Sequence, residues 1–125
     1  MTIRILFATL LATVSAGCGY HEEKGKVAIS VKPTFSSIQT VIVNPKCIRC
    51  HSGAAAPNGI DLTNYTALMR GGTSGTLIVR GNPDESKFYQ VIRSGTMPKG
   101  GPPLSDPEIK AVYDWIESGA GEQES

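Results

Sequence analysis

The sequence has few cysteines, few aromatic side chains and almost no excess of charge of either sign. Its three cysteines are odd in number and too few for a disulfide framework. The 12 Lys and Arg residues nearly balance the 11 Asp and Glu residues, which argues against a nucleic-acid-binding protein with its strong basic excess. Because only 18% of the residues are charged, the chain is not a disordered polyelectrolyte either.

Glycine and proline, by contrast, are frequent, with 14 Gly and 8 Pro among 125 residues. A length of 125 residues fits one domain. A chain so rich in turn-forming residues, with only 6% aromatics, builds a small apolar core. We therefore expect something other than apolar burial to help hold this domain together.

The apolar run of residues 5–14 is too short to cross a bilayer, which needs about 20 residues. It follows Arg4 and precedes small residues and Cys18, which resembles a bacterial lipoprotein signal whose cysteine becomes the acylated first residue. We therefore predict a signal peptide over residues 1–17 and an N-terminal lipid anchor on Cys18. The protein would be exported and held on the periplasmic side of the cell envelope. By this resemblance, Gly19 after the cysteine favours the outer membrane. Ordinary cleavage after Ala16 is the competing interpretation, because Ser15 stands where Leu or Val is usual.

The rest of the chain divides into a tether over residues 18–33, a compact domain over 34–120 and a tail over 121–125. Alternating apolar residues over 27–31 predict one short strand or extended arm. Within the domain only residues 77–79 have a β-like composition, so we predict an all-α fold of about four short helices. The predicted helices cover 36–43, ended by Asn44-Pro45; 64–70, capped by Thr63; a segment from a cap at Asn82 to Ser94-Gly95; and a segment from the Ser105/Glu108 capping box to Gly119.

The motif Cys47-Ile48-Arg49-Cys50-His51 has the C-x-x-C-H pattern of c-type haem attachment. Two thiols three positions apart on a helical turn project to one side, where they can add to the two vinyl groups of a porphyrin. The imidazole of His51 then becomes the proximal ligand of the iron. Its second ring nitrogen is expected to donate to a backbone carbonyl, which fixes the tautomer.

Three other interpretations of the motif stay open at this stage. A thioredoxin-type C-x-x-C sits in a βαβ unit, which this sequence does not predict. A structural zinc site needs four ligands, and beyond the motif only His21 and the predicted lipid-bearing Cys18 could contribute. A simple disulfide between Cys47 and Cys50 is the third.

Met97 is the candidate for the sixth ligand, because a thioether commonly partners His in cytochromes c. Gly95 and Pro98 bracket it in a non-helical loop that can lie over the distal haem face. The alternatives are that Met97 fills the core, that Met69 takes its place or that the position is vacant. Met69 lies within a predicted helix beside Leu68, where packing is the simpler role.

These motifs and the capped final helix resemble a small class I cytochrome c. The segments Gly59-Ile60-Asp61-Leu62, Gly81-Asn82-Pro83-Asp84-Glu85-Ser86, Met97-Pro98 and Pro103-Leu104-Ser105 are similar to the planctomycete-type cytochrome c domain. The resemblance covers residues 35–120. It implies a cytochrome c-like fold of about four short helices around one covalently attached haem c, with His51 and Met97 on the iron. It further implies electron transfer with a redox partner protein that it does not identify.

Several side chains are expected to contribute to the haem pocket. Arg80 could pair with a haem propionate, and Pro57 could pack on the proximal side, as prolines do in this family. Further candidates for the pocket and its surrounding core are Tyr65, Phe88, Pro98, Leu104 and Trp115. A rim of basic residues could attract an acidic partner; its members are Lys46, Arg49, Lys87, Arg93 and Lys99.

We therefore predict a monohaem, one-electron carrier with His/Met axial ligation that is not an enzyme. The sequence supplies no Ser/His/Asp or paired-carboxylate constellation and contains only two histidines. The alternative is a haem enzyme subunit or gas-binding sensor with an open or displaceable distal site. A non-haem binding module on the cell envelope is a third hypothesis. No role in nucleic-acid binding is expected.

Overall fold

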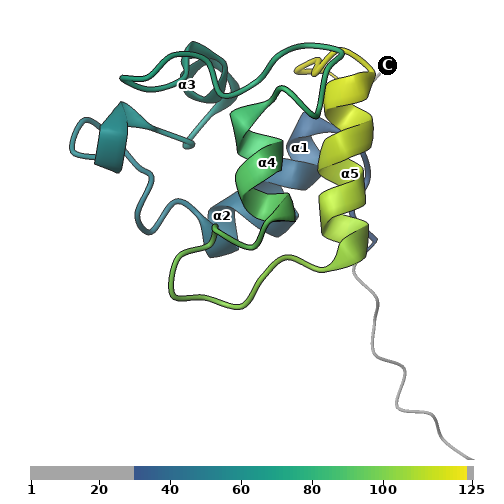
Figure 1. Cartoon of the computed structure of the whole chain (residues 1–125), viewed down its shortest axis with the longest axis horizontal. Helices are drawn as coiled ribbons and strands as arrows, with labels where there is room; N and C mark the ends of the chain where they lie inside the picture. Colours follow the sequence, from purple (N-terminus) through teal and green to yellow (C-terminus); the bar gives the residue numbers. More distant parts are fainter. Residues whose placement is uncertain (1–29, 124–125) are drawn as a thin grey trace, which may run out of the picture.

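The computed structural model of the chain describes residues 30–123. The predicted signal peptide, the lipidation at Cys18, His21 and most of the tether lie outside these residues, as does the end of the tail. Within them the fold is all-α, as the sequence predicts, with four α-helical segments, one short 3-10 helix η2 (Pro57–Gly59) and no strand (Figure 1). The segment 77–79 forms no strand, and the β-structure between residues 30 and 123 consists of one isolated bridge, Gly72 to Gly75.

The first helical segment runs through Pro45 instead of stopping there. It consists of α1 (Phe35–Ile38), a π-helical stretch η1 (Gln39–Val43) and α2 (Asn44–Lys46). The N–H of Asn44 donates to Gln39 O, five residues back, in place of the usual four. In a regular α-helix the ring of Pro45 would clash with the carbonyl four residues before it, and the wider π turn relieves this clash. The predicted end at Asn44-Pro45 is therefore wrong by one helical turn.

Two further helix starts differ from the sequence predictions. Asn64, not Thr63, caps α3 (Tyr65–Arg70), and its side chain accepts from the Ala67 N–H at 2.9 Å. Helix α4 (Lys87–Arg93) begins after Ser86, although Asn82-Pro83 was the predicted start. The buried Ser86 hydroxyl accepts from the Val79 N–H at 2.8 Å, which fastens the preceding turn to an earlier segment. Because of this contact, α4 begins later in the chain than predicted, and residues 83–85 form a turn.

The last helix, α5 (Asp106–Glu117), begins with the predicted Ser105/Glu108 capping box. It ends before Gly119, whose φ of 105° lies in the left-handed region that glycine enters freely. Helix α4 ends at Ser94 and Gly95, as predicted. No helix between residues 30 and 123 has the length and apolar character needed to span a bilayer.

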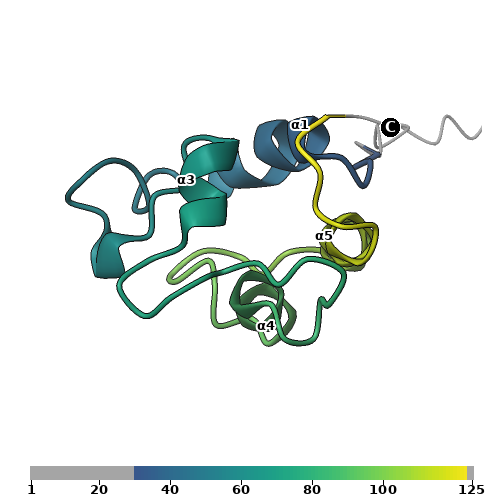
Figure 2. The same ribbon diagram turned by 90° about the horizontal axis from the view of Figure 1, so that it is seen from above.

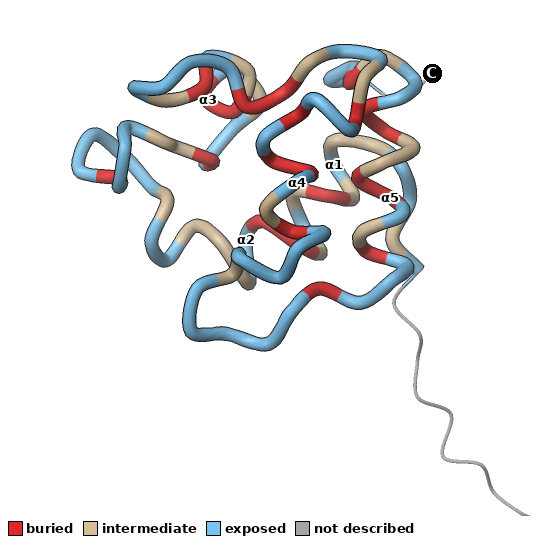
Figure 3. The backbone as a smooth tube through the Cα atoms, in the orientation of Figure 1, coloured by how far each residue is buried: buried red, intermediate tan, exposed pale blue. Residues whose placement is uncertain are grey.

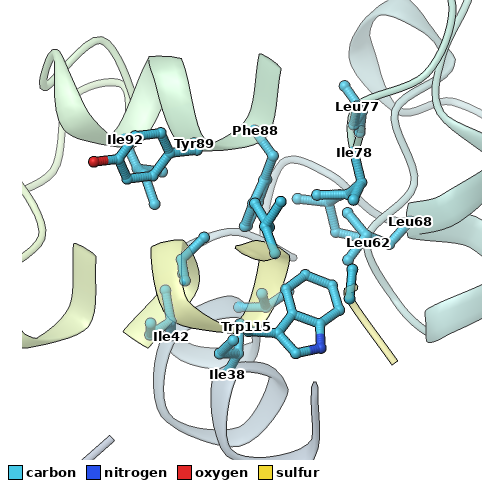
Figure 4. Packing of buried hydrophobic residues seen from close by; sticks show 14 of the residues in the cluster. Ile38, Ile42, Leu62, Leu68, Leu77, Ile78, Phe88, Tyr89, Ile92 and Trp115 are labelled. Carbon is cyan, nitrogen blue, oxygen red and sulfur yellow. The ribbon is translucent and has the colours of Figure 1, made fainter. Parts of the chain in front are cut away.

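The hydrophobic core lies where α5 packs against both α1 and α4 (Figures 1 and 2). Ile38 and Ile42 of the first helical segment meet Phe88 and Ile92 of α4 and Trp115 of α5 (Figure 4). The segments around residues 47–59 and 94–103 are largely exposed and lie at the edge of this core (Figure 3). The three packed helices thus form a scaffold, and the two exposed segments carry the residues that the sequence marks as functional.

Candidate functional site

The Cys47–His51 motif forms a helical turn that directly follows α2. The Cys47 N–H donates to Val43 O at 2.8 Å, and the His51 N–H donates to Cys47 O at 3.0 Å. Cys47 is half-buried and Cys50 is exposed, and both are free thiols with no disulfide between them. Burial raises the pKa of the Cys47 thiol to about 11, against a smaller lowering by neighbouring Lys46.

The imidazole of His51 has the second-nitrogen partner that the sequence predicts. Its Nδ1 lies 3.2 Å from the carbonyl oxygen of Ile60. Because a carbonyl oxygen can only accept, this contact places the proton on Nδ1 and leaves the lone pair on Nε2. The backbone is fastened beside it, since the Leu62 N–H donates to His51 O at 3.0 Å. The ring is therefore held in the tautomer that a metal ligand requires.

Two adjoining cavities meet at His51 and Met97. The first, the inner cavity, has a volume of about 230 Å³, and its lining is mainly apolar: Cys47, His51, Asn58, Ile60, Leu62, Leu77, Lys87, Phe88, Val91, Ile92, Met97, Pro98 and Leu104. The second, the outer cavity, has a volume of about 640 Å³ and is lined by Pro45, Lys46, Arg49, Cys50, His51, Pro57, Asn58, Ile60 and residues 97–102. The motif and the Met-Pro loop thus contribute to the same two spaces.

Met97 reaches this position from the loop after α4. Gly95, with a φ of 72°, turns the chain, and the Met97 N–H donates to Val91 O at 3.0 Å. Met69 lines neither cavity and packs against the hydrophobic core from α3. The structure therefore brings Met97, and not Met69, to the space that His51 lines.

The chemistry of these side chains fits a covalently attached haem. Two thiols adjoin one imidazole whose Nε2 carries its lone pair, and a thioether shares its cavity. The lining of the inner cavity is mainly aliphatic and aromatic, as a porphyrin face requires. The residues present match an iron porphyrin better than a bare metal ion, because no group of three or more His, Cys, Asp or Glu in residues 30–123 could hold an ion.

Four of the seven predicted pocket residues line these cavities. Phe88 and Leu104 line the inner cavity, Pro57 lines the outer one and Pro98 lines both. Val91, a further core candidate of the sequence, also lines the inner cavity, and the lining side chains of that cavity that the sequence did not indicate are Asn58, Ile60, Leu62, Leu77 and Ile92. A signal for Asn58 was present in the Asn-Gly pair, because Asn is a residue that tolerates the left-handed backbone it adopts here, with a φ of 57°.

Tyr65, Arg80 and Trp115 line neither cavity and lie together beside the C-terminal end of α5. The Arg80 guanidinium donates to Ala120 O at 2.7 Å and to the Tyr65 hydroxyl at 2.6 Å. The Trp115 Nε1–H donates to Gly121 O at 2.8 Å. In this structure Arg80 therefore pairs with backbone carbonyls at a helix end, and not at the cavity where a haem propionate was expected.

The five basic residues expected to form a rim are distributed over three places. Lys46, Arg49 and Lys99 line the outer cavity, and Lys87 lines the inner one. Arg93 forms an exposed ion pair of 3.1 Å elsewhere on the surface. Among the described residues that line the outer cavity none is acidic, so its mouth carries positive charge.

Lys46 is also the partner of a buried carboxylate. Its Nζ lies 2.6 and 2.7 Å from the two carboxylate oxygens of Glu108. Glu108 also accepts from the Ser105 N–H at 2.9 Å and from the Ser105 hydroxyl at 3.0 Å. Burial raises the pKa of Glu108, but the hydrogen bonds from Lys46 and Ser105 together lower it by more. The pKa of Glu108 therefore lies below its ordinary value.

The thioredoxin-type interpretation of the cysteine motif finds no support in the described residues. A thioredoxin-type motif needs a βαβ unit, and residues 30–123 contain no strand.

Residues 47–101 match the family model described as Planctomycete cytochrome C. No curated protein and no solved structure matches the chain.

Proposed function

Because residues 47–101 carry a cytochrome c-type domain, which indicates an electron-transfer protein, we propose that this chain is a monohaem, one-electron carrier with His51 and Met97 as axial ligands. The observation that carries the proposal is that His51 and Met97 line the same two cavities, beside the two cysteines. A cytochrome c domain implies haem c, and the proposal adds that one haem is attached through Cys47 and Cys50.

Each residue then has a distinct task in electron transfer. A bound haem would supply an iron that can be either ferrous or ferric, and so could store one electron. Cys47 and Cys50 would hold the porphyrin to the chain as thioethers, and His51, oriented by Ile60 O, would offer Nε2 to the iron. Met97 would offer a soft thioether, which favours ferrous iron and raises the reduction potential. The apolar lining keeps water away, so the surroundings change little when the charge changes.

A haem enzyme subunit or gas-binding sensor remains the second candidate function. Met97 lies in a loop whose residues 99–103 are exposed, so a small ligand could reach the iron if it displaced the thioether. Absorbance spectra of purified holoprotein, with and without carbon monoxide, separate the two functions. A carrier should give a six-coordinate, low-spin reduced spectrum that carbon monoxide does not change at neutral pH. A spectrum that responds to carbon monoxide supports the sensor or enzyme, and the lack of a Soret band rejects haem binding.

We further propose that the redox partner is an acidic protein that docks at the outer cavity. Arg49 and Lys99 line this opening, and neither forms an ion pair with a carboxylate of the described residues. Their charge would speed the encounter with an acidic surface.

We also propose that the protein is a lipoprotein of the periplasmic side of the cell envelope, anchored through Cys18 and favouring the outer membrane. Several acyl chains give firm anchoring at about 0.8 kcal/mol per buried CH₂. Replacing Cys18 with serine should move the haem protein from the membrane fraction to the soluble fraction while leaving its spectrum unchanged. A wild-type mature mass that begins at Gly17 and carries no acyl group would reject this anchor.

A further inference from the structure

The carboxylate of Glu108 connects the two segments that bear the proposed axial ligands. Lys46 is the last residue of α2 and immediately precedes Cys47, the start of the attachment motif. Ser105 is the N-cap of α5 and ends the loop that carries Met97. Because Lys46 and Ser105 both donate to the same carboxylate, Glu108 joins the base of the His51 segment to the base of the Met97 segment.

The Met97 loop has few other attachments near this point. Lys99, Gly100, Gly101, Pro102 and Pro103 are all exposed. Within the loop, the Gly101 N–H donates to Pro98 O at the long distance of 3.4 Å. Upstream, the Met97 N–H is held by Val91 O of α4. The loop is therefore held at its start by α4, and at its end by the buried side chain of Leu104 and by the Glu108 network.

The Lys46–Glu108 pair is not an ordinary surface ion pair. The exposed fraction of the side chain is 11% for Glu108 and 29% for Lys46. Lys110 and Asp114 form a pair of the same length, 2.6 Å, but within one helix and with exposed fractions of 73% and 35%. Removing one partner of a buried pair leaves an uncompensated charge, whereas an exposed pair within one helix contributes little. The two pairs therefore provide a matched comparison.

We propose that Glu108 is a positioning residue that holds the Met97 loop against the helix bearing the haem attachment motif, and so determines how persistently Met97 stays on the iron. This inference rests on the proposed His51/Met97 ligation. Glu108 contacts Lys46 through a charge pair and contacts Ser105 through the capping box. A capping residue alone would stabilise α5 without affecting the ligand bond.

The test uses holoprotein and the variants Glu108→Gln and Lys46→Gln. Glutamine at position 108 keeps the capping-box function but loses the charge pair. The measurement is the weak long-wavelength band of Met–Fe(III) ligation during heating, with helix content followed by circular dichroism in the same sample. Both variants should lose the band at temperatures where helix content is unchanged. The reduced variants should bind carbon monoxide under conditions in which the reduced wild type stays closed to it, because Met97 leaves the iron more often once the buried pair is broken.

Two variants act as controls. Lys46→Arg keeps the charge and should retain the band, and Lys110→Gln removes the exposed pair and should behave as wild type. If Glu108→Gln and Lys46→Gln lose the band only together with their helix signal, the role is structural and the proposal is wrong. It is also wrong if Lys110→Gln has the same effect. A wild-type protein without the band would overturn the proposed His/Met ligation itself, which separates the two failures.

Discussion

Replacing Cys47 or Cys50 with alanine should leave little stable protein in cells. The core between α1, α4 and α5 is small, and the inner cavity of about 230 Å³ beside it is lined largely by apolar side chains. In a haem-free variant this lining would face water or a void, which costs on the order of 5 kcal/mol at roughly 24 cal/mol per Å³ of cavity. That cost is comparable with the whole stability of a small domain, about 5–15 kcal/mol. Haem should therefore contribute to the stability of the fold, in addition to carrying the electron.

The measurement is the yield of haem-stained protein and its thermal unfolding midpoint. Cys18→Ser is the matched control, because it removes a cysteine outside the motif and should retain both haem and stability. A haem-free Cys47→Ala/Cys50→Ala protein that accumulates and unfolds at the wild-type midpoint would contradict this expectation. Apolar burial among the helices would then suffice for folding.

Changing Met97 should have the largest effect on the redox chemistry. Met97→Ala should remove the sixth ligand and admit carbon monoxide, because the thioether lines the inner cavity together with His51. Met97→His should keep six ligands but lower the reduction potential, since imidazole is the stronger donor to ferric iron and axial ligands help set a span of about 0.8 V. Potentiometric titration of the purified holoproteins measures this shift.

Met69→Leu is the control for the methionine assignment. Met69 packs against the core from α3 and lines neither cavity, so leucine replaces one apolar side chain with another. It should leave the potential, the Met–Fe(III) band and the closed response to carbon monoxide unchanged. The assignment is wrong if Met69→Leu abolishes the band while Met97→Leu preserves it.

Local signals predicted most of the helices, and a contact with another segment accounts for the late start of α4. The Ser105/Glu108 capping box lies within one helical turn, so the sequence alone locates the start of α5. Asn82-Pro83 is an equally good local signal, but the Ser86 hydroxyl bonds to the Val79 N–H and the helix begins later. No propensity scale contains that contact, because it joins residues of different segments.

In the candidate site, too, some residues can be predicted from the local sequence and others depend on contacts made by folding. The motif around Cys47 and His51 is contiguous, so its chemistry can be predicted from residue types and spacing. The pairing of Arg80 depends on where the chain folds back, and the structure places it against Ala120 O, 40 residues away. Likewise, nothing local to Glu108 indicates that its carboxylate would reach Lys46, 62 residues earlier.

The first helical segment has to direct side chains at its two ends toward different parts of the protein, and the π-helical stretch η1 lies between these ends. Ile38 must face α5, and Cys47 must face the inner cavity. In an α-helix each residue advances the side-chain direction by about 100°, so one additional residue in a turn rotates all that follows by that angle. If the same residues formed a regular α-helix, the attachment motif would be turned by about 100° around the helix axis and away from the cavity. The irregular turn therefore sets the angular phase of the cofactor site relative to the core.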